Sequence, residues 1–145
     1  MNARRISHVQ LRPWDAPSLL HRSTELRDDD TLQLLWRSPQ ARLLRVDAAS
    51  QFALNPFGMP AAGELDETIA FLGTVHGGPW FAQRVERIPG GETIRDASLT
   101  DTQYQLASAA LAILNWGESA LFCDRCAGRL RRIRGGFAAV CTICG

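Results

Sequence analysis

The chain has 145 residues, of which 46% are hydrophobic and 21% are charged, a balance typical of a folded globular protein rather than a disordered one. No stretch approaches the roughly 18 consecutive apolar residues of a membrane-spanning helix, and the start MNARRISHVQLR lacks the apolar run of a signal peptide. The formal net charge is +1, yet residues 123–145 carry five arginines against one acidic residue. We therefore expect a cytoplasmic protein whose basic charge is concentrated at its C-terminal end.

The first 64 residues predict an irregular start followed by strands. Residues 1–30 contain two prolines and the acidic run Asp28-Asp29-Asp30, so we expect a solvated acidic loop here, with a short helix near residues 17–26. The apolar stretches LQLLWR and ARLLRV, at residues 32–37 and 41–46, predict two strands joined by a turn at Ser38-Pro39-Gln40. A third apolar piece, QFAL at residues 51–54, runs into a loop rich in proline and glycine at residues 55–64.

The next segment predicts a β-hairpin. TIAFLGTV and WFAQRV, at residues 68–75 and 80–85, flank HGGP, and Gly77 and Gly78 permit the positive φ angles of a tight turn. Phe81, Gln83 and Val85 alternate with their neighbours, which predicts a single buried face on this strand. His76 lies in the turn, where we expect it to be solvated rather than to bind a ligand.

Residues 100–119 predict the one long helix of the chain. Thr100 and Gln103 have the spacing of a capping box. Apolar residues then recur at helical spacing, predicting a buried stripe of Tyr104, Ala107, Leu111 and Leu114. Gly117 weakens the end of this helix.

These elements predict an α+β fold with a mixed or antiparallel sheet, one long helix and a small C-terminal ribbon. We expect an N-terminal domain at residues 1–99, a linking helix at residues 100–120 and the ribbon at residues 121–145. Among residues 1–120 we find no P-loop, no GxGxxG and no GxSxG. The sequence therefore offers no catalytic and no cofactor-binding residue.

All four cysteines fall in the C-terminal segment, as two CxxC pairs separated by 14 residues: Cys123, Cys126, Cys141 and Cys144. Each CxxC turn places two thiolates on one side of a loop, and two such turns complete the tetrahedron that Zn²⁺ prefers. Between them, LRRIR, Gly135-Gly136 and FAAV predict strand, turn and strand, the layout of a zinc ribbon. Two disulfides or a redox pair are the alternative, which a reducing compartment disfavours. A fourfold protein-ligated zinc is structural, so chelation should melt residues 122–145 and leave the helix largely intact.

Five arginines crowd the expected ribbon: Arg125, Arg129, Arg131, Arg132 and Arg134. Arginines in a ribbon can neutralise nucleic-acid phosphates. They can equally form a solvated face, or pair with the acidic remainder of the chain. The sequence leaves both interpretations open.

The stretches FLGTVHGGPWFAQRV and LAILNW, followed by FCDRC and CTIC, together resemble the front half of bacterial NADH pyrophosphatases of the Nudix superfamily. The resemblance covers residues 68–145 well and residues 30–67 loosely. It implies a degenerate Nudix-like N-terminal domain, a linking helix and a structural zinc ribbon, in that order. It also implies a homodimer whose front half shapes the substrate cleft, and a following catalytic domain that uses Mg²⁺ or Mn²⁺ to hydrolyse NAD(H) or the NAD cap of RNA.

The chain departs from that family at several positions. Gly117 stands where the family usually has His after the helix Trp, and Ala127-Gly128 follows the first cysteine pair where the family has Gly directly. The Glu-rich box that binds the catalytic metal is absent; Glu64, Asp66 and Glu67 are the nearest acidic group and lack its spacing. The chain stops where that domain would begin, as in a fragment or a natural shortened relative, so we expect no dinucleotide hydrolysis. The rival functions are a stand-alone protein-interaction module and a nucleic-acid-binding ribbon.

Overall fold

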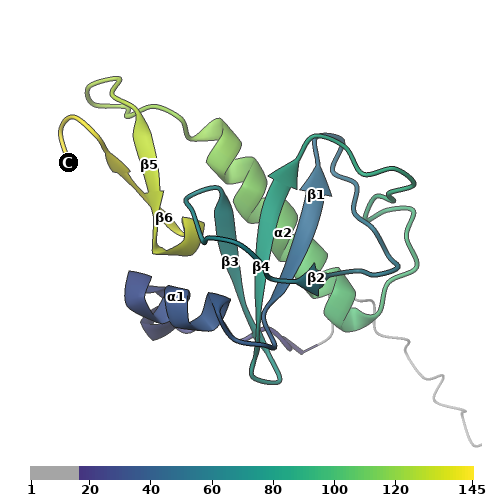
Figure 1. Cartoon of the computed structure of the whole chain (residues 1–145). Coiled ribbons are helices and arrows are strands. Elements are labelled where there is room, and N and C mark those ends of the chain that lie inside the picture. The colour runs from purple at the N-terminus through teal and green to yellow at the C-terminus, as the bar shows by residue number, and fades with distance from the viewer. Residues whose placement is uncertain (1–16) are drawn as a thin grey trace, which may run out of the picture.

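The computed structural model describes residues 17–145, and the expectation for residues 1–16 lies outside that range. Four strands form one mixed sheet in the order β2-β1-β4-β3 (Figure 1). They are β1 (Arg42–Asp47), β2 (Met59–Pro60), β3 (Ile69–Val75) and β4 (Gly78–Val85). Strands β1 and β4 pair in parallel, while the other two pairings are antiparallel. Together with the long helix α2 (Asp101–Ser119), this confirms the predicted α+β class.

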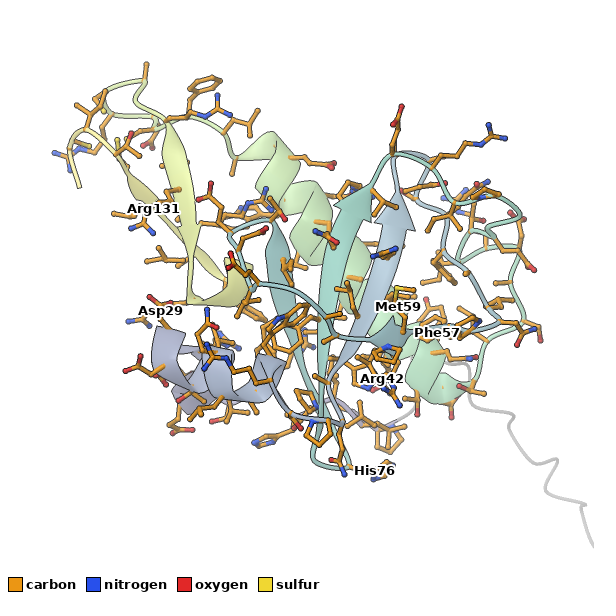
Figure 2. The ribbon with its side chains drawn as sticks, viewed as in Figure 1. Asp29, Arg42, Phe57, Met59, His76 and Arg131 are labelled. Atoms are coloured by element: carbon orange, nitrogen blue, oxygen red, sulfur yellow. The ribbon has the colours of Figure 1, made fainter. Side chains whose placement is uncertain are left out.

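The predicted hairpin is present as β3 and β4. Its turn has positive φ at His76 (49°) and Gly77 (80°). Gly77 was expected to supply this conformation, whereas the second positive φ occurs at His76 and not, as expected, at Gly78. Figure 2 places His76 at the tip of the hairpin. The outer edge of β3 is partly covered, because the backbone of His21 exchanges two hydrogen bonds of 2.9 Å with Thr74.

The predicted strand at residues 32–37 is wrong, because this segment is the helix α1 (Asp29–Trp36). The acidic run, predicted as a loop, begins that helix. Asp28 is its N-cap and accepts a 3.0 Å hydrogen bond from the backbone N–H of Thr31, and the Thr31 hydroxyl and N–H hold the pKa of the Asp28 carboxyl below its ordinary value. Asp29 and Asp30 lie in the first turn, where the helix dipole favours negative charge. Leu32 and Trp36, four residues apart, form the buried side of α1.

One smaller prediction is also corrected. The short helix expected near residues 17–26 is a single 3₁₀ turn, η2 (Thr24–Arg27). In the apolar piece at residues 51–54, only Phe52 makes a β-bridge, and its partner is Glu92. None of the helices within residues 17–145 has the length and apolarity needed to cross a membrane.

The sheet is buried on both faces, so the prediction of one buried face on β4 is wrong. Phe81 and Ala82 are adjacent and point to opposite faces, yet both are fully buried. Helix α2 covers one face, and α1 covers the other together with the tip of the ribbon (Figure 1). The core on the α2 side contains Leu44, Val46, Phe52, Leu72, Ala82, Leu106, Ala110 and Leu114, among others. The core on the α1 side contains Leu32, Trp36, Ala41, Leu43, Ile69, Phe71 and Phe81.

Helix α2 begins with the predicted capping box. The Thr100 hydroxyl accepts from the N–H of Gln103 at 3.2 Å, and the Gln103 side chain accepts from the N–H of Thr100 at 3.0 Å. Of the predicted stripe, Ala107 and Leu114 are buried, while Tyr104 and Leu111 are only half-buried. The buried face is shifted toward smaller residues and consists of Leu106, Ala107, Ala110, Leu114 and Gly117.

Asp47 is a buried carboxylate at the end of β1, with 2% of its surface exposed. One oxygen accepts from the backbone N–H groups of Ala49 and Gln51, both at 2.9 Å, and the other accepts from Ile88 at 3.1 Å. Burial raises the pKa of this carboxyl, but these three donors, with help from the nearby Arg84 cation, outweigh burial and hold the pKa below its ordinary value. Asp47 therefore joins the loop after β1 to the loop after β4.

Candidate metal centre

The four cysteines come together at one end of the C-terminal ribbon. The ribbon is the antiparallel pair β5 (Leu130–Ile133) and β6 (Ala138–Cys141), as predicted. The Sγ atoms of Cys123 and Cys144 are 3.7 Å apart, and those of Cys126 and Cys141 are 3.4 Å apart. All four Sγ atoms lie within 4.8 Å of one another. A tetrahedral zinc with bonds of about 2.3 Å requires sulfur separations of about 3.8 Å, so the four thiolates could share one such ion.

Each CxxC pair is shaped by backbone hydrogen bonds. In the first turn, the carbonyl of Cys123 accepts from Ala127 at 2.9 Å, and its N–H donates to Gly128 at 2.8 Å. In the second, the Cys141 sulfur accepts from the N–H groups of Ile143 and Cys144, at 3.4 and 3.5 Å. These turns present the thiols inward without help from a larger core.

The hydrogen bonds also distinguish the thiols electrostatically. The N–H groups of Cys144 and Ile143 lower the pKa of the Cys141 thiol to about 6, which favours the thiolate that a metal needs. Hydrogen bonds with the sulfurs of Cys126, Cys123 and Cys141 raise the pKa of the Cys144 thiol to about 12, and burial and the charge of Cys123 contribute less. A divalent cation held by all four sulfurs would favour their thiolate forms.

The structure accounts for the unusual Ala127-Gly128 sequence. Ala127 adopts the left-handed φ of 57°, a conformation in which glycine is less strained. Gly128 lies so close to the second pair that a Cβ there would be 2.9 Å from the Cys141 sulfur. Glycine is therefore needed at position 128, and the left-handed backbone conformation, with its strain, is adopted by the alanine at position 127.

The opposite end of the ribbon is packed into the domain. Its tip is the 3₁₀ turn η3 (Arg134–Gly136), which lies between α1 and α2 on the outer part of the sheet (Figure 1). A Cβ on Gly135 would be 2.7 Å from Cβ of Phe71, and one on Gly136 would be 3.3 Å from Cβ of Ala70. Beside the tip, the Arg27 guanidinium lies 3.7 Å from the centre of the Phe137 ring. The ribbon thus touches the core of the domain directly, a contact that the sequence did not indicate.

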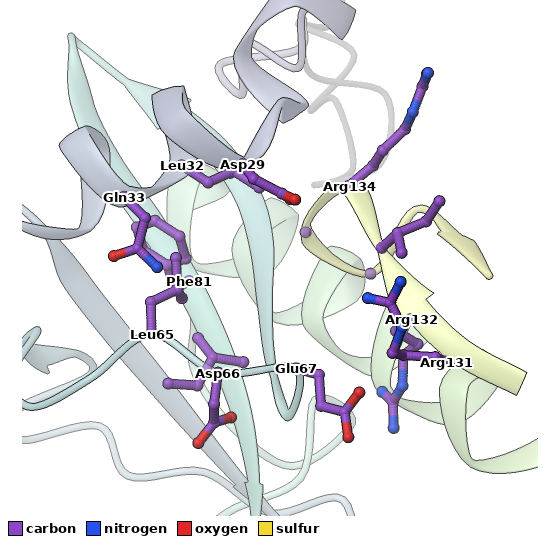
Figure 3. Close-up of a pocket in the computed structure, with 14 residues that line it drawn as sticks. Asp29, Leu32, Gln33, Leu65, Asp66, Glu67, Phe81, Arg131, Arg132 and Arg134 are labelled. Carbon is purple, nitrogen blue, oxygen red and sulfur yellow. The ribbon is translucent and has the colours of Figure 1, made fainter. Parts of the chain in front are cut away.

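A hollow of about 270 Å³ lies where the ribbon meets the domain. Figure 3 shows Asp29, Asp66 and Glu67 along one side, and Arg131 and Arg132 along the other. None of these three carboxylates is within ion-pair distance of a ribbon arginine. Within residues 17–145, the ion pair is the one between Arg84 and Glu118. The two walls of the hollow therefore carry opposite charge, as expected if the ribbon arginines face the acidic part of the chain, but no direct ion pair forms across it.

The five ribbon arginines occupy different surroundings. Arg132 points toward α2, since a Cβ on Gly117 would be 2.2 Å from its guanidinium. Its charge thus lies at the last turn of the helix, where the dipole favours a cation. Arg131 and Arg134 are exposed near the hollow, whereas Arg125 and Arg129 are exposed near the cysteine end.

The acidic group noted in the sequence does not form a second metal site. Asp66 accepts hydrogen bonds from the N–H and hydroxyl of Thr68, at 2.8 and 2.5 Å, and so shapes the turn before β3. Within residues 17–145, the four cysteines are the group of His, Cys or carboxylate side chains close enough to share an ion.

No protein-family model and no curated protein matches the chain.

Proposed function

We propose that Cys123, Cys126, Cys141 and Cys144 hold a structural Zn²⁺ ion that folds the ribbon and keeps its tip on the sheet. The observation that carries this proposal is the mutual approach of four sulfurs at tetrahedral spacing. Four cysteine ligands leave no open position for substrate or water, which assigns the ion a structural role. The proposal includes a cytoplasmic location, because thiols stay reduced there.

Metal content and spectroscopy test this centre. We expect one zinc per chain by elemental analysis, and on replacement by Co²⁺ the absorption of a tetrahedral tetrathiolate complex. Cys126→Ser and Cys144→Ser change exposed ligands and should abolish stoichiometric binding. Asp124→Asn changes an exposed carboxylate in the same turn and should leave binding intact. Full metal content in both serine variants would refute the four-cysteine site.

We further propose that the chain is the non-catalytic N-terminal and ribbon portion of an NADH-pyrophosphatase-like Nudix hydrolase. Support comes from the order of its parts: a sheet domain with the β3–β4 hairpin, then α2 with Asn115 and Trp116 in its C-terminal part, then the four-cysteine ribbon. A ribbon packed on the sheet would present one rigid surface for shaping a substrate cleft or a dimer.

Three measurements test this assignment. With NADH and Mn²⁺ the chain alone should show no turnover above the blank, because it lacks the acidic box that binds the catalytic metal. Titration with NADH, followed by amide chemical shifts, should reveal weak binding, and sedimentation should reveal a dimer. Turnover would contradict a non-catalytic role. A monomer with no NADH-dependent shifts would contradict the cleft and dimer roles.

A further inference from the structure

The outer face of the ribbon carries an aromatic ring and two arginines in register. Phe122 forms an antiparallel bridge with Arg129, and the flanking hydrogen bonds, Leu130 to Leu121 and Cys123 to Gly128, make this a pair whose side chains lie close together on one face. Arg131 follows Arg129 by two residues on β5 and therefore points to the same face.

The alternation of β5 separates this face from the domain. Leu130 and Arg132 point toward α2 and are half-buried, whereas Arg129 and Arg131 are exposed. Figure 2 shows Arg131 projecting from the side of the ribbon turned away from α2. The outer face is thus exposed, although Arg129 and Arg131 also border hollows between the ribbon and the domain; the inner face packs on the helix.

The outer face combines an exposed aromatic ring with two arginines that have no protein partner. Phe122 keeps 59% of its surface exposed and lies directly before Cys123. Within residues 17–145, neither the Arg129 nor the Arg131 guanidinium has a hydrogen-bond or ion-pair partner. Glu67 borders the hollows next to both arginines but lies beyond ion-pair distance of either.

We propose that this face binds single-stranded nucleic acid, with a base stacked on Phe122 and neighbouring phosphates on Arg129 and Arg131. The two arginines are separated by about 7 Å along the extended backbone that leads into β5, comparable with the spacing of adjacent phosphates in an extended strand. Aromatic stacking beside backbone-tracking arginines is the usual way that proteins bind single strands without sequence preference. The interface needs a folded ribbon but does not depend on the NADH pyrophosphatase assignment.

Fluorescence anisotropy with labelled oligo(U), oligo(dT) and a duplex of equal length tests the proposal on the zinc-loaded chain. Arg129→Ala/Arg131→Ala should lower single-strand affinity roughly 20-fold at 0.1 M salt and flatten the slope of log K against log salt by about 1.4. Phe122→Ala should cost about tenfold, and Phe122→Trp should restore binding. The matched control, Arg87→Ala/Arg95→Ala, removes the same charge from exposed positions outside the ribbon and should change affinity little.

Zinc content and circular dichroism of each variant separate loss of the interface from loss of the ribbon fold. The proposal is overturned if the metal-loaded chain binds no single strand at low salt. It is equally overturned if the duplex binds more tightly, or if the control variant weakens binding as much as Arg129→Ala/Arg131→Ala.

Discussion

Replacing Gly135 by Ala should detach the ribbon from the sheet. Gly135 has a φ of +65°, and an added Cβ would lie 2.7 Å from Cβ of Phe71. The left-handed backbone alone costs an alanine about 1 kcal/mol. Phe71 is fully buried and its Cβ moves only with its backbone, so the clash adds about 2 kcal/mol of overpacking. We expect Gly135→Ala to lower the free energy of unfolding by about 3 kcal/mol.

Gly63→Ala is a matched control for this change. Gly63 has a φ of +80° but no atom within 4 Å of the added Cβ, so only the backbone cost of about 1 kcal/mol applies. Urea unfolding of the zinc-loaded variants, followed by the fluorescence of the tryptophans, gives both values on one scale. If the two variants lose equal stability, the tip of the ribbon does not lie against Phe71 and the docked arrangement is wrong.

Three further changes test other contacts. Ala127→Gly should raise stability by up to about 1 kcal/mol in thermal melts, because it relieves the left-handed φ of 57°; a loss of stability would refute the strain. Asp47→Ala should lower the free energy of unfolding measured in urea by about 3 kcal/mol, because it leaves three buried N–H donors unpaired. The folded-state pKa of Asp47 is depressed, so the stability that its carboxylate contributes is complete above about pH 4 and is lost as pH falls through the folded-state pKa. The stability of the variant should therefore vary less with pH in that range than the stability of the unmodified chain. Chelation of the metal should unfold the ribbon and leave α2 helical. It should also lower the melting temperature of the domain, because the ribbon tip no longer covers Phe71. Unchanged amide signals from β5 and β6 in the presence of chelator would contradict a structural metal.

Local signals in the sequence predicted those elements whose determinants are local. The hairpin follows from Gly77, α2 from its capping box, and the cysteine cluster from two CxxC pairs whose geometry is set within each turn. Helix α1 was missed because LQLLWR contains too few polar residues to reveal a helical period. Asp28, three residues before Thr31, was the available signal, since it caps the helix through the Thr31 N–H.

Contacts between distant segments were not predictable in the same way. The alternation of residues on β4 predicted one buried face, because a local pattern cannot show what packs on the second face. In the structure that second face is covered by α1 and by the tip of the ribbon, some 50 residues later in the chain. Gly135-Gly136 was readable only as a turn. That the same pair permits close approach to Ala70 and Phe71 depends on where β3 lies. The exposure of Phe122 likewise follows from the placement of the ribbon, not from the residues around it.

The metal and the docked tip stabilise the same small ribbon from opposite ends. Two strands of four residues are marginal in water by themselves, so neither end alone should keep the ribbon ordered. Because a metal that binds only the ordered ribbon stabilises it by mass action, weaker docking must appear as weaker metal binding. Gly135→Ala should therefore lower zinc affinity although position 135 touches no cysteine, whereas Gly63→Ala should not. A competition titration with a chromophoric chelator measures both, and equal zinc affinities would show that the cysteine turns fold independently of the sheet.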